Sequence, residues 1–102
     1  MRVKFKNVEK EFQASYITEQ RVIRDGVAIG WVAMINLSDE SITAQELETI
    51  LTPENISEFH CIGEDTETPI TNTITGYDKV TSCAVKYTSS KTTAEIQLTK
   101  GM

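Results

Sequence analysis

The chain has 102 residues and a mass of 11.4 kDa, which is enough for one domain with an ordinary hydrophobic core. Hydrophobic residues make up 39% and charged residues 25%, a composition typical of a globular protein. Fifteen acids against ten bases give a net charge of -5, which argues against a basic nucleic-acid binder and against attachment to anionic lipid by charge. We therefore expect a single α+β domain over residues 1–102, whose partners are proteins rather than nucleic acid or membrane.

The chain carries no recognisable export or membrane-spanning signal. Its first eight residues alternate cations with apolar side chains and lack the apolar stretch of a signal peptide. The longest apolar run, residues 27–35, is shorter than the roughly 20 residues that a membrane span needs. Cys61 and Cys83 lack the CxxC spacing, so we expect two free, buried thiols in a reducing compartment.

The first part of the chain predicts a short strand followed by a β-hairpin. Residues 12–23 and 27–37 are two apolar, β-branched runs on either side of Asp25 and Gly26. Asp-Gly between such runs is a strong hairpin signal, because glycine readily adopts the positive φ that a tight turn needs.

The two strands of this hairpin differ in their apolar pattern. Alternation places Phe12, Ala14, Tyr16 and Thr18 on one face of the first strand. In the second strand both faces of residues 27–35 are apolar, which is typical of a strand in the middle of a sheet or at an interface. Both alternatives are open at this point.

The middle of the chain predicts one α-helix around residues 43–51. Thr43 and Glu46 have the spacing of a capping box, in which the N-cap side chain and the third helical residue satisfy each other's backbone groups. Pro53 ends this helix, since the residue before a proline avoids the helical conformation, and it also begins a second, single capped turn.

The remainder of the chain is typical of strands. Four strand-like segments follow the helix, at residues 56–62, 70–75, 80–88 and 92–99. The sequence therefore predicts an α+β fold, in which an antiparallel β-sheet is built from the N-terminal hairpin and a C-terminal meander around one central helix.

The sequence contains no specific motif for catalysis or metal binding. His60 and Cys61 are neighbours on a predicted strand and should point to opposite faces, so they should not converge with Cys83 on a metal ion. The acidic run at residues 64–67 lacks the spacing of an EF-hand loop. We expect no enzymatic activity, no cofactor and no metal site.

Two groups of residues are candidates for contact with another protein. Aromatic residues and methionine are enriched at interface centres, although core packing is the alternative for each of them. The apolar candidates are Phe12, Tyr16, Trp31 and Met34. The acidic candidates are Asp39, Glu40, Glu46 and Glu48.

The charges are segregated along the chain. Residues 38–67 contain nine acids and no lysine or arginine, whereas residues 1–37 and 68–102 each carry a net charge of +2. A molecule that is acidic in one part and basic in the rest can associate head to tail with further copies. A solvated acidic surface is the alternative.

The order of segments over residues 42–100 is similar to that of a known class of small proteins. It consists of the helix AQELETIL, the turn TPENIS, the strand FHCI, an acidic turn, Tyr77, and the closing strands CAVKY and AEIQLTK. This order resembles small prophage-encoded virion proteins, of the tail or the head–tail junction, from phages of Gram-positive bacteria. The resemblance implies a non-enzymatic structural protein in the host cytoplasm or the virion, and it carries over no catalytic residue.

Two hypotheses about function follow. The first is a structural or interaction protein of phage or prophage origin that self-associates, as a homo-oligomer, or binds a protein partner. The second is an acidic intracellular regulator or anti-defence inhibitor, in which the acids of residues 38–67 occupy a basic site on a host protein.

Overall fold

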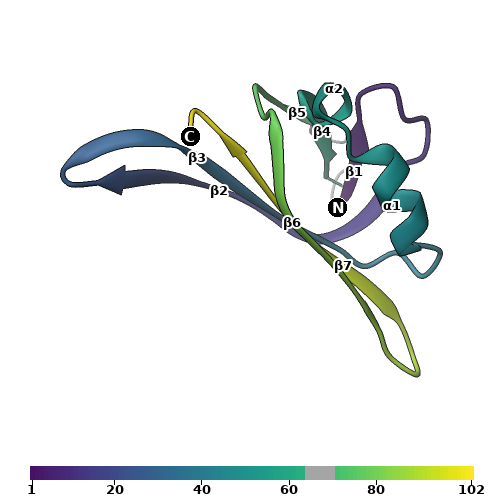
Figure 1. Ribbon diagram of the computed structural model, residues 1–102. Helices are drawn as coiled ribbons and strands as arrows, with labels where there is room; N and C mark the ends of the chain where they lie inside the picture. The colour runs from purple at the N-terminus through teal and green to yellow at the C-terminus, as the bar shows by residue number, and fades with distance from the viewer. Residues whose placement is uncertain (64–70) are drawn as a thin grey trace.

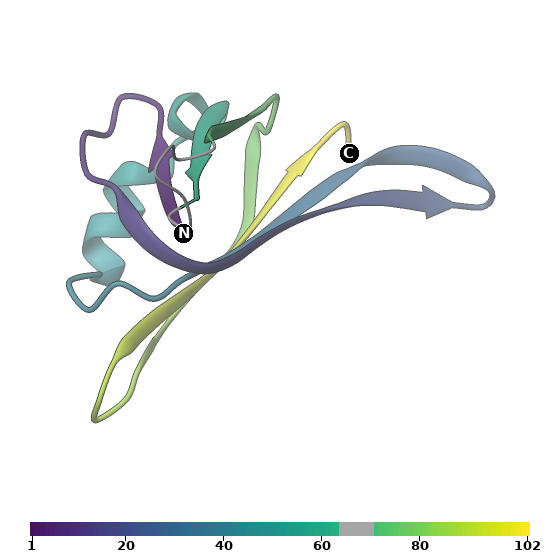
Figure 2. The ribbon, with the colours of Figure 1, turned by 180° about the vertical axis from the view of Figure 1, so that it is seen from behind.

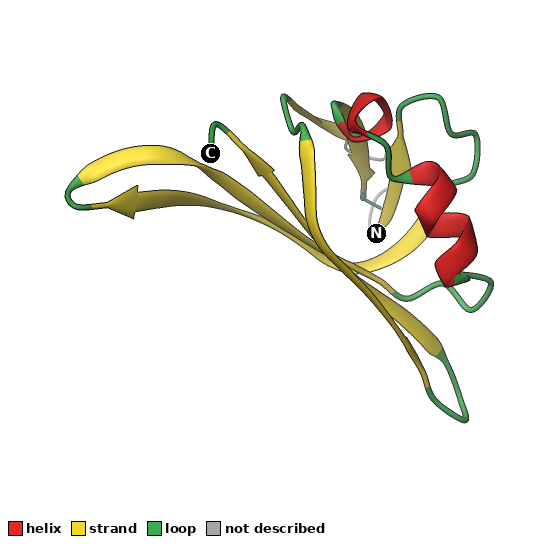
Figure 3. Ribbon diagram, in the orientation of Figure 1, coloured by secondary structure: helices red, strands yellow, loops and turns green. Residues whose placement is uncertain are grey.

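The computed structural model describes residues 1–63 and 71–102, which form a mostly antiparallel β-sheet with two short helices (Figure 1, Figure 3). In these residues the elements are β1 (Arg2–Phe5), β2 (Phe12–Arg24), β3 (Val27–Leu37), α1 (Ala44–Ile50), α2 (Pro53–Ile56), β4 (Glu58–Ile62), β5 (Thr71–Thr75), β6 (Lys79–Tyr87) and β7 (Thr92–Lys100). The predicted antiparallel sheet with its N-terminal hairpin is confirmed. The predicted C-terminal meander is wrong, because β4–β5 and β6–β7 pair as two separate hairpins and β5 and β6 lie at opposite edges of the sheet.

The strands follow the order β5-β4-β1-β2-β3-β7-β6, and each neighbouring pair is antiparallel. β1 pairs with β2 only near the start of β2, at Gln13 and Phe12, so the sheet divides there into two parts. β2, β3, β7 and β6 form a long twisted ribbon, while β1, β4, β5 and both helices lie over one side of it (Figure 1, Figure 2). The ribbon thus has a covered face and an open face.

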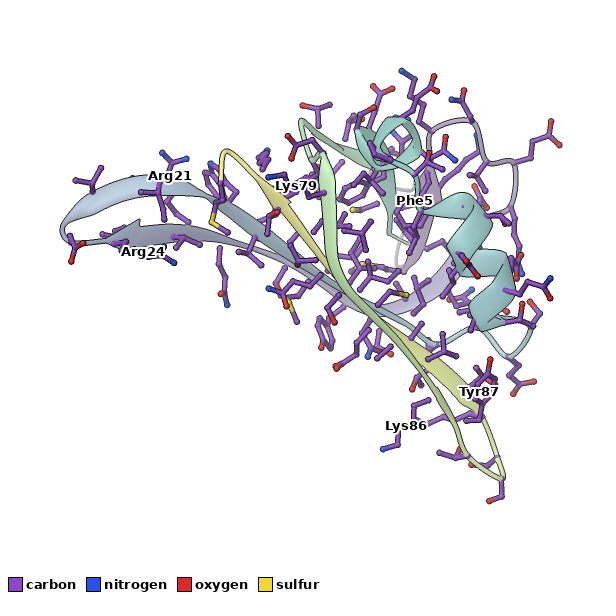
Figure 4. The ribbon with its side chains drawn as sticks, viewed as in Figure 1. Phe5, Arg21, Arg24, Lys79, Lys86 and Tyr87 are labelled. Carbon is purple, nitrogen blue, oxygen red and sulfur yellow. The ribbon has the colours of Figure 1, made fainter. Side chains whose placement is uncertain are left out.

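The core lies between the ribbon and the elements that cover it. Four buried rings form a chain in the order Phe12, Phe5, Phe59 and Tyr77, with successive centroids 6.3, 5.7 and 6.0 Å apart. Such tilted and edge-on contacts are the favoured geometry for aromatic pairs. Figure 4 shows Phe5 inside this layer, and buried aliphatic side chains surround the rings: Ala33, Ile35, Leu37, Leu47, Ile56, Ala94, Ile96 and Leu98.

The predicted helix forms, but it is one of two helices in the described residues. The Oγ1 of Thr43 accepts a hydrogen bond from the backbone N–H of Glu46 at 3.1 Å, as the capping prediction requires. The carboxylate of Glu46 instead accepts from the Nζ of Lys10 at 3.2 Å, so it bonds a side chain from another part of the chain. Thr52 caps the second helix, α2, with Pro53 in its first turn, which confirms the predicted capped turn.

The turn between β2 and β3 lies where the sequence predicts it. Asp25 and Gly26 have φ angles of 52° and 77°. Two consecutive residues with positive φ characterise the type I′ turn, whose twist matches that of the flanking strands. The hairpin prediction is confirmed.

An irregularity near the start of β2 changes the faces that its residues occupy. The pairing of β2 with β3 shifts register between Ala14 and Tyr16, and Ile17 then lies opposite the buried Ile35. One extra residue in a strand inverts the side-chain alternation that follows it. The prediction that Tyr16 and Thr18 share the face of Ala14 is therefore wrong, because the bulge turns both to the open face.

β3 lies in the middle of the ribbon, between β2 and β7. Ala33, Ile35 and Leu37 are buried on its covered face. On the open face Val32 and Met34 are half-buried, although the same alternation pattern predicted a second covered side. The central-strand interpretation of this segment is confirmed, and its second apolar face is partly exposed.

Candidate functional site

The end of the β2–β3 hairpin, residues 21–29, projects beyond the rest of the molecule, and we call it the arm (Figure 1, Figure 2). Pairing of β3 with β7 ends at Trp31, so the strands of the arm beyond this point pair only with each other. A two-stranded ribbon has little surface against which to bury its side chains. Ile23 and Val27, on either side of the turn, are 67% and 61% exposed.

The base of the arm is held by a cluster of aromatic and charged side chains. The ring of Trp31 lies between two cations, with the guanidinium of Arg21 at 5.3 Å and the Nζ of Lys100 at 5.7 Å from its centroid. The same Nζ lies 4.5 Å from the ring of Tyr77, whose hydroxyl donates a hydrogen bond to Glu19 at 2.7 Å. Burial, and then this hydrogen bond, raise the pKa of Tyr77 well above its usual value.

A second surface feature is an apolar groove of about 390 Å³ between α1 and β6, which we call the groove. Tyr87, which is 61% exposed, lies at the α1 side of β6 (Figure 4), and its hydroxyl accepts a hydrogen bond from the backbone N–H of Ala44 at 3.2 Å. The lining is mostly apolar and carries one carboxylate, and it includes Leu47, Glu48, Leu51, Cys83 and Val85. A groove of this size and character suits aliphatic side chains flanked by a cation.

The structure separates the apolar candidates that the sequence suggested. Phe12 is fully buried in the core, which corrects its assignment as an interface residue. Tyr16 is 40% exposed on the open face, where its hydroxyl donates to Glu95 at 3.1 Å, and Met34 lies half-buried on that face. Trp31 belongs to the base of the arm. The four candidates therefore do not form one surface.

Two of the four acidic candidates bond to other side chains, and the other two are exposed. Asp39 accepts hydrogen bonds from the hydroxyl and the backbone N–H of Ser41 at 2.7 and 2.9 Å, and these bonds lower the pKa of its carboxyl group. Glu46 forms the ion pair with the lysine described above. Glu40 and Glu48 are exposed, and Glu48 lines the groove.

The cysteines are free, but only one of them is in the predicted environment. Cys61 is half-buried, and burial raises the pKa of its thiol to about 11. Cys83 is exposed at the groove, so the prediction of two buried thiols is wrong for this residue. Its strand lies at the edge of the sheet, and a neighbouring strand therefore flanks it on one side alone.

The residues considered for metal binding do not gather in the described part of the chain. Within residues 1–63 and 71–102, no three His, Cys, Asp or Glu side chains are placed to hold a metal ion. His60 is engaged through its Nδ1 with the hydroxyl of Thr73 at 2.9 Å. The acidic run at residues 64–67 lies outside the described residues.

Sequence reasoning missed both the tip of the arm and the groove. A signal for the arm was present, because the hairpin strands have 13 and 11 residues, whereas the strand that precedes them has only four. Strands of such unequal length cannot pair over their whole extent, so part of the hairpin must project. The groove depends on how α1 lies over β6, and these elements are far apart along the chain, with α2, β4 and β5 between them.

In the described part of the chain, no helix is long and apolar enough to cross a membrane. No protein-family model, curated protein or solved structure matches this chain.

Proposed function

We propose that this chain is a non-enzymatic structural protein that acts by binding further copies of itself. The arm is the observation that carries this proposal. Its turn exposes Ile23 and Val27 on a two-stranded hairpin that no third strand of residues 1–63 and 71–102 supports. Exposed apolar side chains that gather on a projecting element are typical of a contact surface.

The distribution of charge supports self-association over binding to an unrelated protein. Residues 38–63, which include α1 and α2, contain six acids and no lysine or arginine, whereas the arm carries two arginines, Arg21 and Arg24, and one acid, Asp25. Figure 4 shows both arginines on the β2–β3 hairpin, away from the helices. One copy therefore presents both members of a complementary pair of surfaces.

The resemblance of residues 42–100 to small prophage-encoded virion proteins supplies a setting for this activity. A subunit of a phage tail or head–tail junction must bind identical neighbours in a repeated arrangement. We place the protein in that class, and hence in the host cytoplasm before assembly and in the virion after it.

Sedimentation velocity over a series of protein concentrations tests the proposal. We expect the mean mass to rise with concentration, and we expect the double variant Ile23→Ser/Val27→Ser to sediment as a monomer where the natural chain is assembled. Tyr16→Ser, an exposed aromatic residue on the open face, is the control and should assemble normally. A natural chain that stays monomeric up to about 1 mM, the limit of weak specific association, would overturn the proposal.

A further inference from the structure

We infer that the tip of the arm of one copy binds in the groove between α1 and β6 of a second copy. This inference rests on the proposed self-association and names the surface that receives the arm.

The two surfaces match in apolar character. At the tight turn Val27 is an exposed aliphatic side chain; it pairs with Arg24 and shares its face of the hairpin, whereas Ile23 pairs with Ala28 and lies on the other face. The groove offers aliphatic walls that include Leu51 and Val85, and its volume of about 390 Å³ leaves room for the Val27 side chain. Filling such a groove with aliphatic groups removes apolar surface of both partners from water.

The two surfaces also match in charge. The tip carries the exposed Arg24 and Asp25, and of these Arg24 shares the face of Val27. The exposed Glu48 is the charged residue of the groove lining, so Arg24 is the tip residue that complements it. An arginine at the rim of an apolar contact orients the partners and speeds their association. Because this pair is exposed to solvent, added salt should slow association more than it speeds dissociation.

The shape of the molecule makes the contact intermolecular. The arm and α1 lie at opposite ends of the molecule in both views (Figure 1, Figure 2), so a chain cannot place its own tip in its own groove. Each copy has one tip and one groove, and these are different surfaces. A contact of this heterologous kind adds copies in rows or closes them in rings.

Mixing two defective variants tests this arrangement. Val27→Asp disables the tip, and Cys83→Asp places a charge in the groove at an exposed position. Each should raise the dissociation constant of self-association by roughly 30-fold or more, as charged substitutions at the centre of a contact do. Thr18→Asp on the open face, and Ser82→Asp on the opposite face of β6, are matched controls that should assemble normally.

The mixture should behave differently from either variant alone. One intact groove from the tip variant and one intact tip from the groove variant remain, so the mixture should form 1:1 dimers and nothing larger in sedimentation velocity. A mixture that stays monomeric overturns the contact, as does a groove variant that assembles normally. If the natural chain assembles in either case, the proposed function stands while this inference fails; if the natural chain never assembles, both fail.

Cross-linking provides a second test that does not depend on disabling either surface. Cys83 supplies a native thiol in the groove, and Val27→Cys supplies one at the tip, in a background in which Cys61→Ser removes the other thiol. Dissolved oxygen with copper–phenanthroline accepts the two electrons and two protons that the thiols lose when a disulfide forms. We expect disulfide-linked oligomers that disappear on reduction and in the added variant Cys83→Ser. Assembly without such cross-links would place the tip elsewhere.

Discussion

Replacement of Tyr77 by phenylalanine tests whether the cluster at the base of the arm stabilises the fold. Tyr77 is 1% exposed, and its hydroxyl donates to the carboxylate of Glu19, which lies 58 residues away along the chain, at 2.7 Å. The substitution removes one oxygen atom and leaves the ring in contact with Phe59 and with the ammonium group of Lys100. It therefore isolates the hydrogen bond from the packing.

The expected loss of stability follows from the charge and the exposure of the acceptor. Hydrogen bonds to charged groups contribute about 1.5–3 kcal/mol, and the lower end applies because the side chain of Glu19 is 32% exposed and water can replace the lost donor. We expect Tyr77→Phe to lower the free energy of unfolding by about 1.5 kcal/mol, which corresponds to a fall in Tm of roughly 6–12 °C for a chain of this size.

The same substitution should remove part of the alkaline sensitivity of the protein. Burial and the Glu19 carboxylate raise the pKa of Tyr77 in the folded chain. The contribution of this raised pKa to the free energy of unfolding is thus complete below about pH 10, the usual pKa of tyrosine. It is lost above that pH, because Tyr77 releases its proton in the unfolded chain before it does so in the folded chain. Urea unfolding between pH 8 and 11 should show a smaller decline above pH 10 in Tyr77→Phe than in the natural chain.

Tyr16→Phe is the matched control, since Tyr16 also donates to a glutamate, Glu95, but is 40% exposed on the open face. Solvent competes for an exposed hydrogen bond, so this variant should change the free energy of unfolding by less than about 0.5 kcal/mol. Equal effects of the two substitutions, or a Tyr77→Phe variant as stable as the natural chain, would refute the reasoning about the buried pair.

Three further substitutions or modifications probe other parts of the structure. Gly30→Ala should lower the free energy of unfolding by about 1–3 kcal/mol in urea titrations, because the added Cβ would lie 2.6 Å from the backbone oxygen of Lys100 and the strands must move apart. Thr43→Ala should lower the free energy of unfolding by about 1 kcal/mol through loss of the helix N-cap, and Thr43→Ser should retain most of that stability. A thiol reagent at pH 8, followed by peptide mass analysis, should modify Cys83 before Cys61, because burial keeps the Cys61 thiol protonated; the opposite order would contradict the assigned burial.

Turns and caps could be predicted because their causes are local. The positive φ angles at Asp25 and Gly26 depend on two adjacent residues, and the cap at Thr43 depends on a backbone N–H three residues later. Each of these signals lies within one short stretch of sequence. The order of elements in the chain could therefore be predicted with little knowledge of the tertiary structure.

Side-chain faces were less predictable because one bulge changes all the residues after it. The register shift between Ala14 and Tyr16 leaves no composition signal, yet it moves Tyr16 from the face of Ala14, where alternation placed it, to the open face. Phe12 and Tyr16 were grouped as interface candidates because both are aromatic, and the structure buries the first and exposes the second. The cluster around Tyr77 was equally hidden, since its members come from four separate segments of the chain.

The base and the tip of the arm are stabilised by different contacts, and this difference links the stability of the fold to self-association. At the base, Trp31 and Tyr77 are fixed by contacts with Lys100 and Glu19, whereas beyond Trp31 no third strand in the described part of the chain pairs with the arm. A two-stranded hairpin is marginally stable by itself, so the tip keeps its binding shape only while its base is held. Binding in a groove adds the missing support at the tip. We therefore expect Tyr77→Phe to weaken self-association at a temperature where the variant remains folded, although Tyr77 touches neither surface of the proposed contact. Tyr16→Phe should leave self-association unchanged.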